Sequence, residues 1–337
     1  MNGKSIFATG LTTMAIGFVA FSLPAQAATE LKTIACFQRN HDYVQALHQK
    51  FVEPMNAAKG AVAIKYLGGP EVTPRTKQAG ALKRGLVDII FCPAAYYGGQ
   101  LMEARLPGAH NLPLDEIRKN GGWEMMQQAW GKGLNSRILA WTHFGGQKFF
   151  VYTKFEPKLS EKTGLDLSGV KMRGTGLYKA FLSAMGATVV VISPGDVYSA
   201  LERGVVDGVA WPWGSMASYG WEKFLKYRIE PDFFGATMTL LVNKDKWESL
   251  SNDAKAQLEK SARAYEKAAD AIMVQKGHED DAKLKKAGIK TITLTGKVRD
   301  AYIKTIYGAK WAENDSHAKK ASVDYKMLKS KLYDPSR

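Results

Sequence analysis

Short apolar runs alternate with amphipathic stretches along this chain, and the alternation predicts strands separated by helices. The expected strands are Thr33–Phe37, Val62–Leu67, Leu86–Cys92, Val170–Gly174, Thr188–Ile192 and Val205–Trp211. The expected helices between them are His41–Lys59, one ending near Arg84, Leu177–Met185 and one ending at Arg203. Ser193, with Asp196 three residues later, predicts a capping box at the start of the last helix. Strands and helices in this order indicate an α/β fold.

One segment of the chain recurs. Residues 81–88 and 200–207 agree at six of eight positions with an offset of 119, which also carries Pro93 onto Pro212. Each copy ends a helix, passes through a glycine suited to a left-handed C-cap, and enters a buried strand. Because the same order of elements surrounds both copies, we interpret them as two βαβαβ units made by duplication of a lobe.

Two such lobes predict a crevice between them, since open α/β sheets bind ligands beyond the carboxyl ends of their strands. We assign residues 28–150, with a return segment at about 238–276, to the first lobe. Residues 151–237, with the C-terminal helices at about 277–337, form the second. Apolar residues at helical spacing predict one long helix over about 251–286 that spans both lobes, the alternative being two helices broken near Gly277.

The N-terminus has the pattern of a secretory signal. Residues 1–27 carry Lys4 as their only charge, then an apolar run from Leu11 to Leu23 and small residues up to Ala27, after which cleavage is expected. A membrane anchor is the alternative, but this run falls short of the roughly 20 apolar residues that span a bilayer. We therefore expect an exported protein.

Composition and charge narrow the class of partner. With 337 residues, 45% of them hydrophobic, the chain is long enough for two cored domains. The formal net charge of +15 falls to +14 once Lys4 leaves with the signal. In an exported protein this charge disfavours nucleic acid and favours anionic solutes or lipid head groups, the alternative being an ordinary basic surface.

The two cysteines, Cys36 and Cys92, exclude a disulfide scaffold or a structural zinc site. In a sheet of 2-1-3 order they are expected near the carboxyl ends of neighbouring strands. Adjacent strands are close enough for a disulfide, but side-chain direction decides, so a bridge and two free buried thiols both remain open.

Enzyme motifs are missing from the chain. The six histidines show no metal-ligand spacing, the Gly174-Thr175-Gly176 segment is too short for a dinucleotide fingerprint, and Ser215 lacks the glycines of a nucleophile elbow. We therefore expect no catalytic residues and no cofactor.

Recognition chemistry, in contrast, gathers at the strand ends. Arg173 ends an apolar strand, so its planar guanidinium is expected in the crevice, where it can hold a carboxylate by two parallel hydrogen bonds. A structural ion pair is the alternative. Aromatic side chains after the other strands favour an organic acid over phosphate or a metal ion. The further candidate ligand-binding residues at these ends are Phe37, Glu71, Tyr96, Trp211 and Trp213.

Two motifs carry a family resemblance. Leu-Ser-Gly-Val-Lys-Met-Arg at 167–173, followed by the segment Ser193–Gly208, resembles the signature of the solute-binding subunits of TRAP (tripartite ATP-independent periplasmic) transporters. The resemblance implies a two-lobe periplasmic binding protein fold with the ligand in the cleft between the lobes. It also implies that Arg173, which matches the family's arginine, holds the solute's carboxylate.

The segment after the Asp-Gly pair departs from the family pattern. Many members have Gln-Glu-Asn-Pro there, with a solute-binding asparagine, whereas this chain has Val209-Ala210-Trp211-Pro212. A branch that binds 2-oxo acids has Glu-Trp at the same place and holds a metal ion with that glutamate, the tryptophan carbonyl and an upstream glutamine. Trp211 matches the tryptophan and Gln147 matches the glutamine, which makes Gln147 a further candidate ligand-binding residue. Because Ala210 replaces the only anionic ligand, we expect no bound metal.

These features together predict a periplasmic, monomeric binding protein that captures a small organic carboxylate and delivers it to the membrane permease subunits of a TRAP transporter. A single arginine among aromatic rings favours a monocarboxylate, either a 2-oxo or 2-hydroxy acid or an aromatic acid. A secreted hydrolase and a binding protein of an ATP-driven importer are the alternatives.

Overall fold

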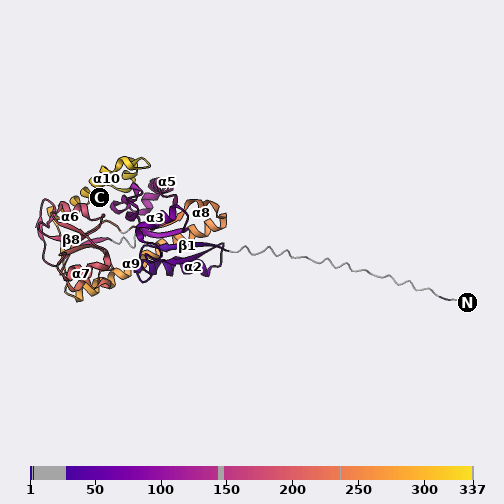
Figure 1. Ribbon diagram of the computed structural model, residues 1–337, viewed down its shortest axis with the longest axis horizontal. Coiled ribbons are helices and arrows are strands. Elements are labelled where there is room, and N and C mark those ends of the chain that lie inside the picture. Colours follow the sequence, from indigo (N-terminus) through magenta and orange to yellow (C-terminus); the bar gives the residue numbers. More distant parts are fainter. Residues whose placement is uncertain (2, 4–27, 143–147, 236, 336–337) are drawn as a thin grey trace.

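The computed structural model describes residues 1, 3, 28–142, 148–235 and 237–335 of the chain. They form two lobes that lie side by side, one around β1 with α2 and α3, the other around β8 with α6 and α7 (Figure 1). Each lobe is built on one sheet with helices packed against it, so the predicted α/β fold of two lobes is confirmed.

The sheet of the first lobe has the strand order β2-β1-β3-β12-β4. Its strands are β1 (Thr29–Ala35), β2 (Val62–Gly68), β3 (Ile89–Pro93), β4 (Ser136–Thr142) and β12 (Met238–Asn243). Its helices are α1 (Asp42–Leu47), a π-helical turn (His48–Val52), α2 (Glu53–Ala57), α3 (Arg75–Lys83), α4 (Leu114–Lys119), α5 (Gly122–Leu134) and α8 (Lys244–Ser249). Short 3₁₀ turns follow β3 at Ala94–Tyr97, Met102–Arg105 and Pro107–Ala109.

The sheet of the second lobe has the order β13-β11-β5-β10-β8-β9. Its strands are β5 (Phe149–Thr153), β8 (Lys171–Gly174), β9 (Thr188–Val191), β10 (Gly208–Pro212), β11 (Tyr227–Phe233) and β13 (Lys290–Thr293). A separate hairpin joins β6 (Lys158–Ser160) and β7 (Gly164–Asp166). The helices are α6 (Lys179–Ala184) and α7 (Val197–Glu202), with 3₁₀ turns at Pro194–Asp196, Ala217–Tyr219 and Trp221–Lys223.

The internal repeat corresponds to equivalent structure in the two lobes. The orders β2-β1-β3 and β9-β8-β10 are both parallel, and the repeated glycines have left-handed φ values of +69° at Gly85 and +70° at Gly204. The repeated aspartates, Asp88 and Asp207, make the same hydrogen bond in both lobes. A side-chain oxygen of Asp88 accepts a hydrogen bond from the backbone N–H of Lys32 at 2.8 Å, and Asp207 does the same for Lys171 at 3.0 Å.

The capping box expected at Ser193 does not form. Ser193 precedes a 3₁₀ turn instead of an α-helix, and its hydroxyl makes no capping hydrogen bond. The carbonyl of Ser193 accepts from the N–H of Asp196 at 3.0 Å, so the backbone closes the turn that the side chains were expected to close.

The chain passes from one sheet to the other between β4 and β5 and again between β11 and β12. β5 of the second lobe follows β4 of the first, and β12 of the first lobe follows β11 of the second. Each crossing strand adds antiparallel to the third strand of a βαβαβ unit, β12 beside β3 and β5 beside β10. The described ends of these strands, Met238 beside Pro93 and Phe149 beside Pro212, therefore lie next to the strand ends where a ligand was expected.

Helix α9 (Asn252–Lys286) is one continuous helix that contacts both lobes. At Gly277, where a break was the alternative, an added Cβ would lie within 2.5 Å of the Trp213 ring, so the glycine allows the ring to pack closely. Of the C-terminal helices, α10 (Gly296–Ser316) packs on α6, and α11 (Tyr325–Leu332) packs on α5, with a 3₁₀ turn (Ala318–Lys320) between them. The domain bounds given above stay a prediction.

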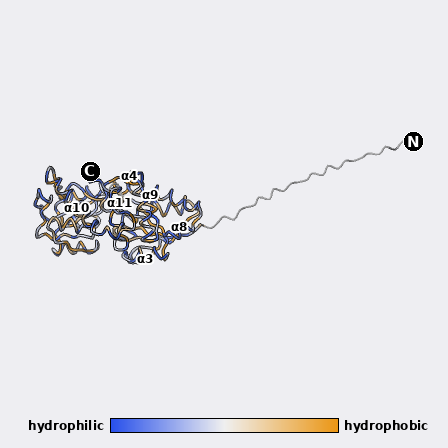
Figure 2. Tube along the Cα trace, turned by 90° about the horizontal axis from the view of Figure 1, so that it is seen from above, coloured by the Kyte–Doolittle hydropathy of each residue, from blue (hydrophilic) through white to orange (hydrophobic). Residues whose placement is uncertain are grey.

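Hydrophobic and hydrophilic positions alternate along the trace of both lobes (Figure 2), as expected for elements that each bury one face. Fully buried rings, among them Trp130, Trp141 and Trp221, anchor the packing. Within the described residues, no helix combines the length and the apolar composition needed to cross a membrane.

Candidate functional site

A cavity of about 230 Å³ lies between the lobes, at the carboxyl ends of strands from both sheets. Phe37 and Pro93 reach it from the ends of β1 and β3, and Arg173 and Trp211 reach it from the ends of β8 and β10. Met238 lines it from the crossing strand β12. The cavity thus forms where open α/β sheets bind their ligands.

Arg173 is a buried cation at this cavity. Only 1% of its surface is exposed, and its Nε donates a hydrogen bond to the carbonyl of Ile192 at 3.0 Å. Among the described residues, Arg173 forms no ion pair, and its buried Nη1 has no hydrogen-bond partner. Burial lowers the pKa of Arg173, but an arginine guanidinium stays protonated in proteins. An unpaired buried charge is costly, which favours an anionic ligand at this position.

Trp211 supports that guanidinium. The Cζ atom of Arg173 lies 5.1 Å from the centre of the Trp211 ring, within the range of a cation–π interaction. The indole Nε1–H donates to the hydroxyl of Ser215 at 2.9 Å, and the ring of Trp221 packs edge-on at 4.7 Å. These contacts fix the orientation of the indole beside the arginine.

The first lobe contributes an aromatic wall. Phe37 stacks on His41 with ring centres 4.2 Å apart, and Tyr96 lies 6.3 Å from Phe37. His41 is the N-cap of α1, and its Nδ1 accepts a hydrogen bond from the N–H of Tyr43 at 3.2 Å. Burial, aided by the positive charge of Arg75, lowers the pKa of His41 to about 4, so the ring is neutral at neutral pH.

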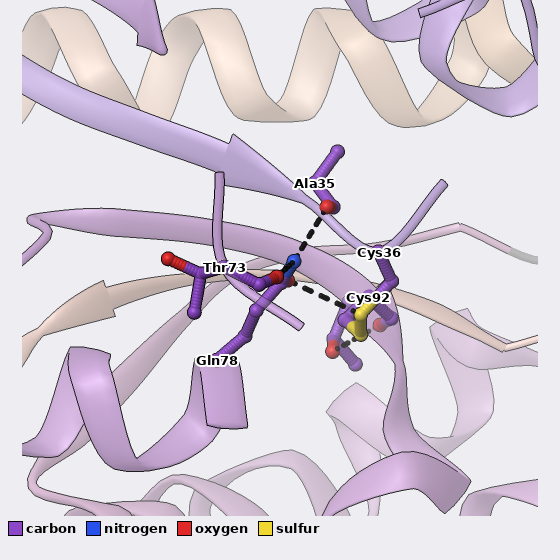
Figure 3. The surroundings of a disulfide bond; sticks show 6 residues. Ala35, Cys36, Thr73, Gln78 and Cys92 are labelled. Atoms are coloured by element: carbon purple, nitrogen blue, oxygen red, sulfur yellow. Dashed lines mark hydrogen bonds between the residues drawn. A yellow bond between two sulfur atoms is a disulfide. The ribbon is translucent and has the colours of Figure 1, made fainter. Parts of the chain in front are cut away.

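Cys36, the residue before Phe37, forms a disulfide with Cys92 (Figure 3). The Cα atoms are 5.1 Å apart, and the backbone N–H of Cys36 donates to the carbonyl of Phe91 at 3.0 Å. The cysteines lie at the ends of neighbouring strands, as predicted, and of the two states left open the structure has the bridge. The side chain of Gln78 holds the same region by donating to the carbonyls of Ala35 and Thr73 at 2.7 and 2.9 Å.

The structure brings four of the predicted site residues to one cavity, namely Arg173, Trp211, Phe37 and Tyr96. Trp213 lies elsewhere, because its ring packs against Gly277 and, edge-on at 5.3 Å, against His278 of α9. Glu71 also lies away from the cavity, where its carboxylate accepts from the N–H of Gly69 within its own turn. Gln147 and the expected signal over 1–27 fall outside the described residues.

Two cations at the cavity, Arg105 and Lys310, were not predicted. Arg105 comes from a 3₁₀ turn well beyond β3, and Lys310 comes from α10, an element with no counterpart in the repeat. Tyr178 was also missed, although it follows Arg173 by five residues and precedes α6 as its N-cap. Lys148, a basic residue near the crossing, pairs with Asp232 at 3.0 Å and does not line the cavity.

The described residues at the cavity offer a poor set of ligands for a metal ion. Ala210 is fully buried and offers no ligand where a glutamate would be needed. Within the described ranges, no carboxylate lines the cavity and no group of three or more His, Cys, Asp or Glu side chains is placed to hold a cation.

A cavity between two α/β lobes, with a buried arginine facing it, is the arrangement of a binding protein that takes a small anionic solute. The family model for the bacterial extracellular solute-binding protein, family 7 (DctP), matches residues 114–313, which is more than half of the chain. The chain therefore belongs to this family and is a solute-binding subunit of the TRAP type.

Individual relatives are distant. A protein of Nostoc sp. named monocarboxylate 2-oxoacid-binding periplasmic protein is 33% identical over 96 residues, which are 27% of this chain and only 26% of that protein. A solute-binding protein of Albidiferax ferrireducens is 23% identical over 346 residues, covering 94% of this chain and 96% of its own. The crystal structure of a TRAP transporter solute-binding protein from Bordetella bronchiseptica, with calcium and picolinate bound, has a TM-score of 0.74 at 22% identity and covers 90% of this chain and 92% of its own.

Proposed function

We propose that this protein captures a small organic acid in the periplasm, as a monomer, and delivers it to the membrane permease subunits of a TRAP transporter. The observation that carries the proposal is Arg173, a guanidinium at 1% exposure that faces the cavity with a buried donor left unpaired by the described residues. A carboxylate supplies both the missing negative charge and two acceptor oxygens in the plane of the guanidinium.

The rest of the cavity suits an organic body. Phe37 of the first lobe and Trp211 and Phe149 of the second line the cavity with aromatic rings. A disulfide next to Phe37 and the hydrogen bond from Trp211 to Ser215 hold these walls in place. We therefore propose a monocarboxylate, such as a 2-oxo, 2-hydroxy or aromatic acid. The names of two similar proteins, one for 2-oxo acids and one with bound picolinate, support this class. We expect no metal ion to take part, because Ala210 removes the carboxylate that such an ion requires.

The two lobes both contact the cavity, so a solute bound there bridges them. A ligand that touches both walls binds the closed arrangement more tightly than an open one and shifts the population toward closure. We propose that this closed, loaded form is the one that the permease subunits receive. Binding without chemical change separates this function from that of a secreted hydrolase.

A thermal-shift screen of the purified protein against small carboxylates tests the proposal. A ligand at one hundred times its dissociation constant adds about 2.7 kcal/mol to the free energy of unfolding, which gives a clear rise in melting temperature. The hits are then titrated calorimetrically and recovered unchanged after incubation. A panel in which no carboxylate stabilises the protein would refute the function, and succinate or malate binding more tightly than every monocarboxylate would refute the monocarboxylate class.

A further inference from the structure

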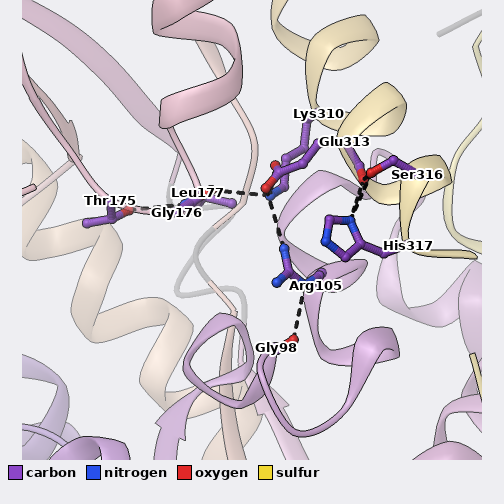
Figure 4. Close-up of polar contacts among 9 residues, drawn as sticks. All are labelled: Gly98, Arg105, Thr175, Gly176, Leu177, Lys310, Glu313, Ser316 and His317. Carbon is purple, nitrogen blue, oxygen red and sulfur yellow. Dashed lines mark hydrogen bonds and ion pairs between the residues drawn. The ribbon is translucent and has the colours of Figure 1, made fainter. Parts of the chain in front are cut away.

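A cluster of charged residues from elements outside the two repeated units reaches the cavity. Lys310 of α10 and Arg105 of the first lobe both line the cavity, and Glu313 joins them from behind (Figure 4). The ammonium of Lys310 lies 2.8 Å from one carboxylate oxygen of Glu313, and Nη1 of Arg105 lies 3.4 Å from the other. The cations face the cavity, whereas the carboxylate does not line it.

Backbone contacts hold each cation of this cluster in place. Nε of Arg105 donates to the carbonyl of Gly98 at 3.0 Å, and Nζ of Lys310 donates to the carbonyl of Gly176 at a longer 3.4 Å. Gly98 belongs to the first lobe and Gly176 to the loop that follows the strand of Arg173, so the cluster lies across both lobes. Both glycines line the same cavity.

Unused donors remain on both cations. An ammonium has three donors, and Glu313 and Gly176 accept from Lys310 at two of them. Lys310 is only 3% exposed, so little water can reach the third. Nη2 of Arg105 makes no hydrogen bond with the described residues. A buried donor left unpaired costs more than an ordinary hydrogen bond gains, which makes such a site reject ligands without an acceptor.

The cluster and Arg173 reach the cavity from different elements, because a 3₁₀ turn and α10 carry the cluster and β8 carries Arg173. Burial lowers the pKa of Lys310, and the charges that act on this ammonium are those of Glu313 and Arg105. Glu313 neutralises one of the two cations, and Arg105, with 27% of its side chain exposed, is partly solvated. The cluster therefore does not require a second full negative charge from a ligand, but it does offer hydrogen-bond donors to an acceptor atom.

We propose that Lys310 and Arg105 form a second recognition point, which selects organic acids that carry an acceptor oxygen away from the carboxylate held by Arg173. This inference rests on the proposed function and narrows its substrate class. The carboxylate sets where the solute binds, and the distal oxygen, a keto or hydroxyl oxygen, decides which acid binds best. Glu313 is a positioning residue that holds both donors toward the cavity.

Paired acids of similar size test the proposal by calorimetric titration. The pairs are levulinate with 4-methylpentanoate and 4-hydroxybenzoate with 4-methylbenzoate, in which only the first acid of each pair has a distal oxygen. In the wild type we expect the oxygen-bearing acid of at least one pair to bind about tenfold or more tightly than its partner, the effect of one buried donor being satisfied. Lys310→Met should reduce this ratio to less than threefold.

Matched variants separate recognition from a structural role. Lys148→Met makes the same charge change at a site off the cavity and should leave the ratio unchanged. If Lys310→Met weakens both acids of a pair equally, the cluster only ties the lobes together and the second recognition point is refuted. Arg105→Met, which leaves the Lys310–Glu313 pair intact, gives the same comparison should Lys310→Met fail to fold, and a full wild-type ratio in that variant would also refute the shared site.

The outcomes for the two proposals differ. Acids that bind through Arg173 with an unchanged ratio in the Lys310 and Arg105 variants would leave the proposed function standing and overturn only the second recognition point. A wild type that binds no acid of either pair, nor any in the wider panel, overturns both.

Discussion

The two βαβαβ units of this protein share a backbone plan and differ in what they present at the cavity. β1 and β8 lie at the centre of a 2-1-3 arrangement, and the pairing register is the same, since Ile34 faces Ile90 in the first unit and Arg173 faces Val209 in the second. The repeated helix ends agree too, because Leu86 and Val205 each donate to the carbonyl five residues earlier. Equivalent positions can therefore be compared one by one.

The difference lies at the carboxyl ends of those strands. Where the first unit has the buried Ile34, the second has Arg173, and where the first has Cys92, the second has Trp211. One unit joins its strand ends by a disulfide next to the aromatic Phe37, and the other packs an indole on a guanidinium. A few residues at the strand ends thus decide what each unit presents to the cavity. The first unit presents a rigid apolar wall, and the second presents a cationic wall.

The largest expected effect on stability comes from removing the disulfide of the first lobe. The double variant Cys36→Ala, Cys92→Ala loses a bridge across a sequence separation of 56 residues, and we expect about 2–4 kcal/mol less free energy of unfolding, because the open chain gains loop entropy. Urea unfolding measures the loss. Wild type in a reductant should match the variant, and alkylation of two cysteines in the unreduced protein would show that the bridge is absent.

The next largest effect is expected on ligand affinity, from a change in the cationic wall of the second unit. Arg173→Lys keeps the charge but loses the planar pair of donors, so we expect the identified acid to bind at least tenfold more weakly, roughly 1.5–3 kcal/mol. Arg203→Lys, the same change at an exposed position of the repeat, serves as the control. Equal affinities for wild type and Arg173→Lys would place the carboxylate anchor elsewhere.

The strand ends within the repeat and the long helix α9 were predictable from the sequence, but the cavity residues that come from outside the repeat were not. Strand ends at Phe37, Arg173 and Trp211 point to the cavity because parallel strands end at one edge of a sheet. Trp213 follows a strand end as well, but its direction depends on Gly277, more than sixty residues away, which no local pattern reveals. Lys310 was beyond prediction for a related reason, since tertiary packing alone brings α10 to the cavity.

The residues at the N-termini of α1 and α6 differ in how their protonation responds to pH. His41 caps α1 through its side chain, Tyr178 holds the N-cap position of α6 without a capping hydrogen bond, and both line the cavity. Burial lowers the pKa of His41 from its ordinary 6.5 to about 4, whereas burial raises the pKa of Tyr178, so only the first wall responds to mild acid. Between these two His41 values the unfolded chain binds more protons, and stability therefore falls as the pH drops from about 6.5 toward 4.

His41→Asn tests that difference, because asparagine keeps an N-cap acceptor without the titration. At pH 5 we expect the variant to lose about 1–2 kcal/mol less than the wild type does, relative to pH 8, where the two should be alike. The fall will not vanish, because burial also lowers the pKa of His110 to about 4. Urea unfolding curves at both pH values measure the effect, and identical pH dependence in the two proteins would contradict it.

The smallest expected effect concerns what the two units have in common. Asp88 and Asp207 each accept a backbone N–H of the first strand of their unit, but Asp88 is 8% exposed and Asp207 is more accessible to water. Replacing either aspartate with Ala leaves that N–H without its acceptor, and the free energy of unfolding should fall by about 0.5–1.5 kcal/mol. The fall should be larger for Asp88→Ala, because water can replace the lost acceptor more easily in the second lobe. Chemical denaturation of the two variants side by side measures both values. A larger loss from Asp207→Ala would mean that the repeated aspartates are not equivalent in their contribution, and that the second unit depends on this contact more than its exposure indicates.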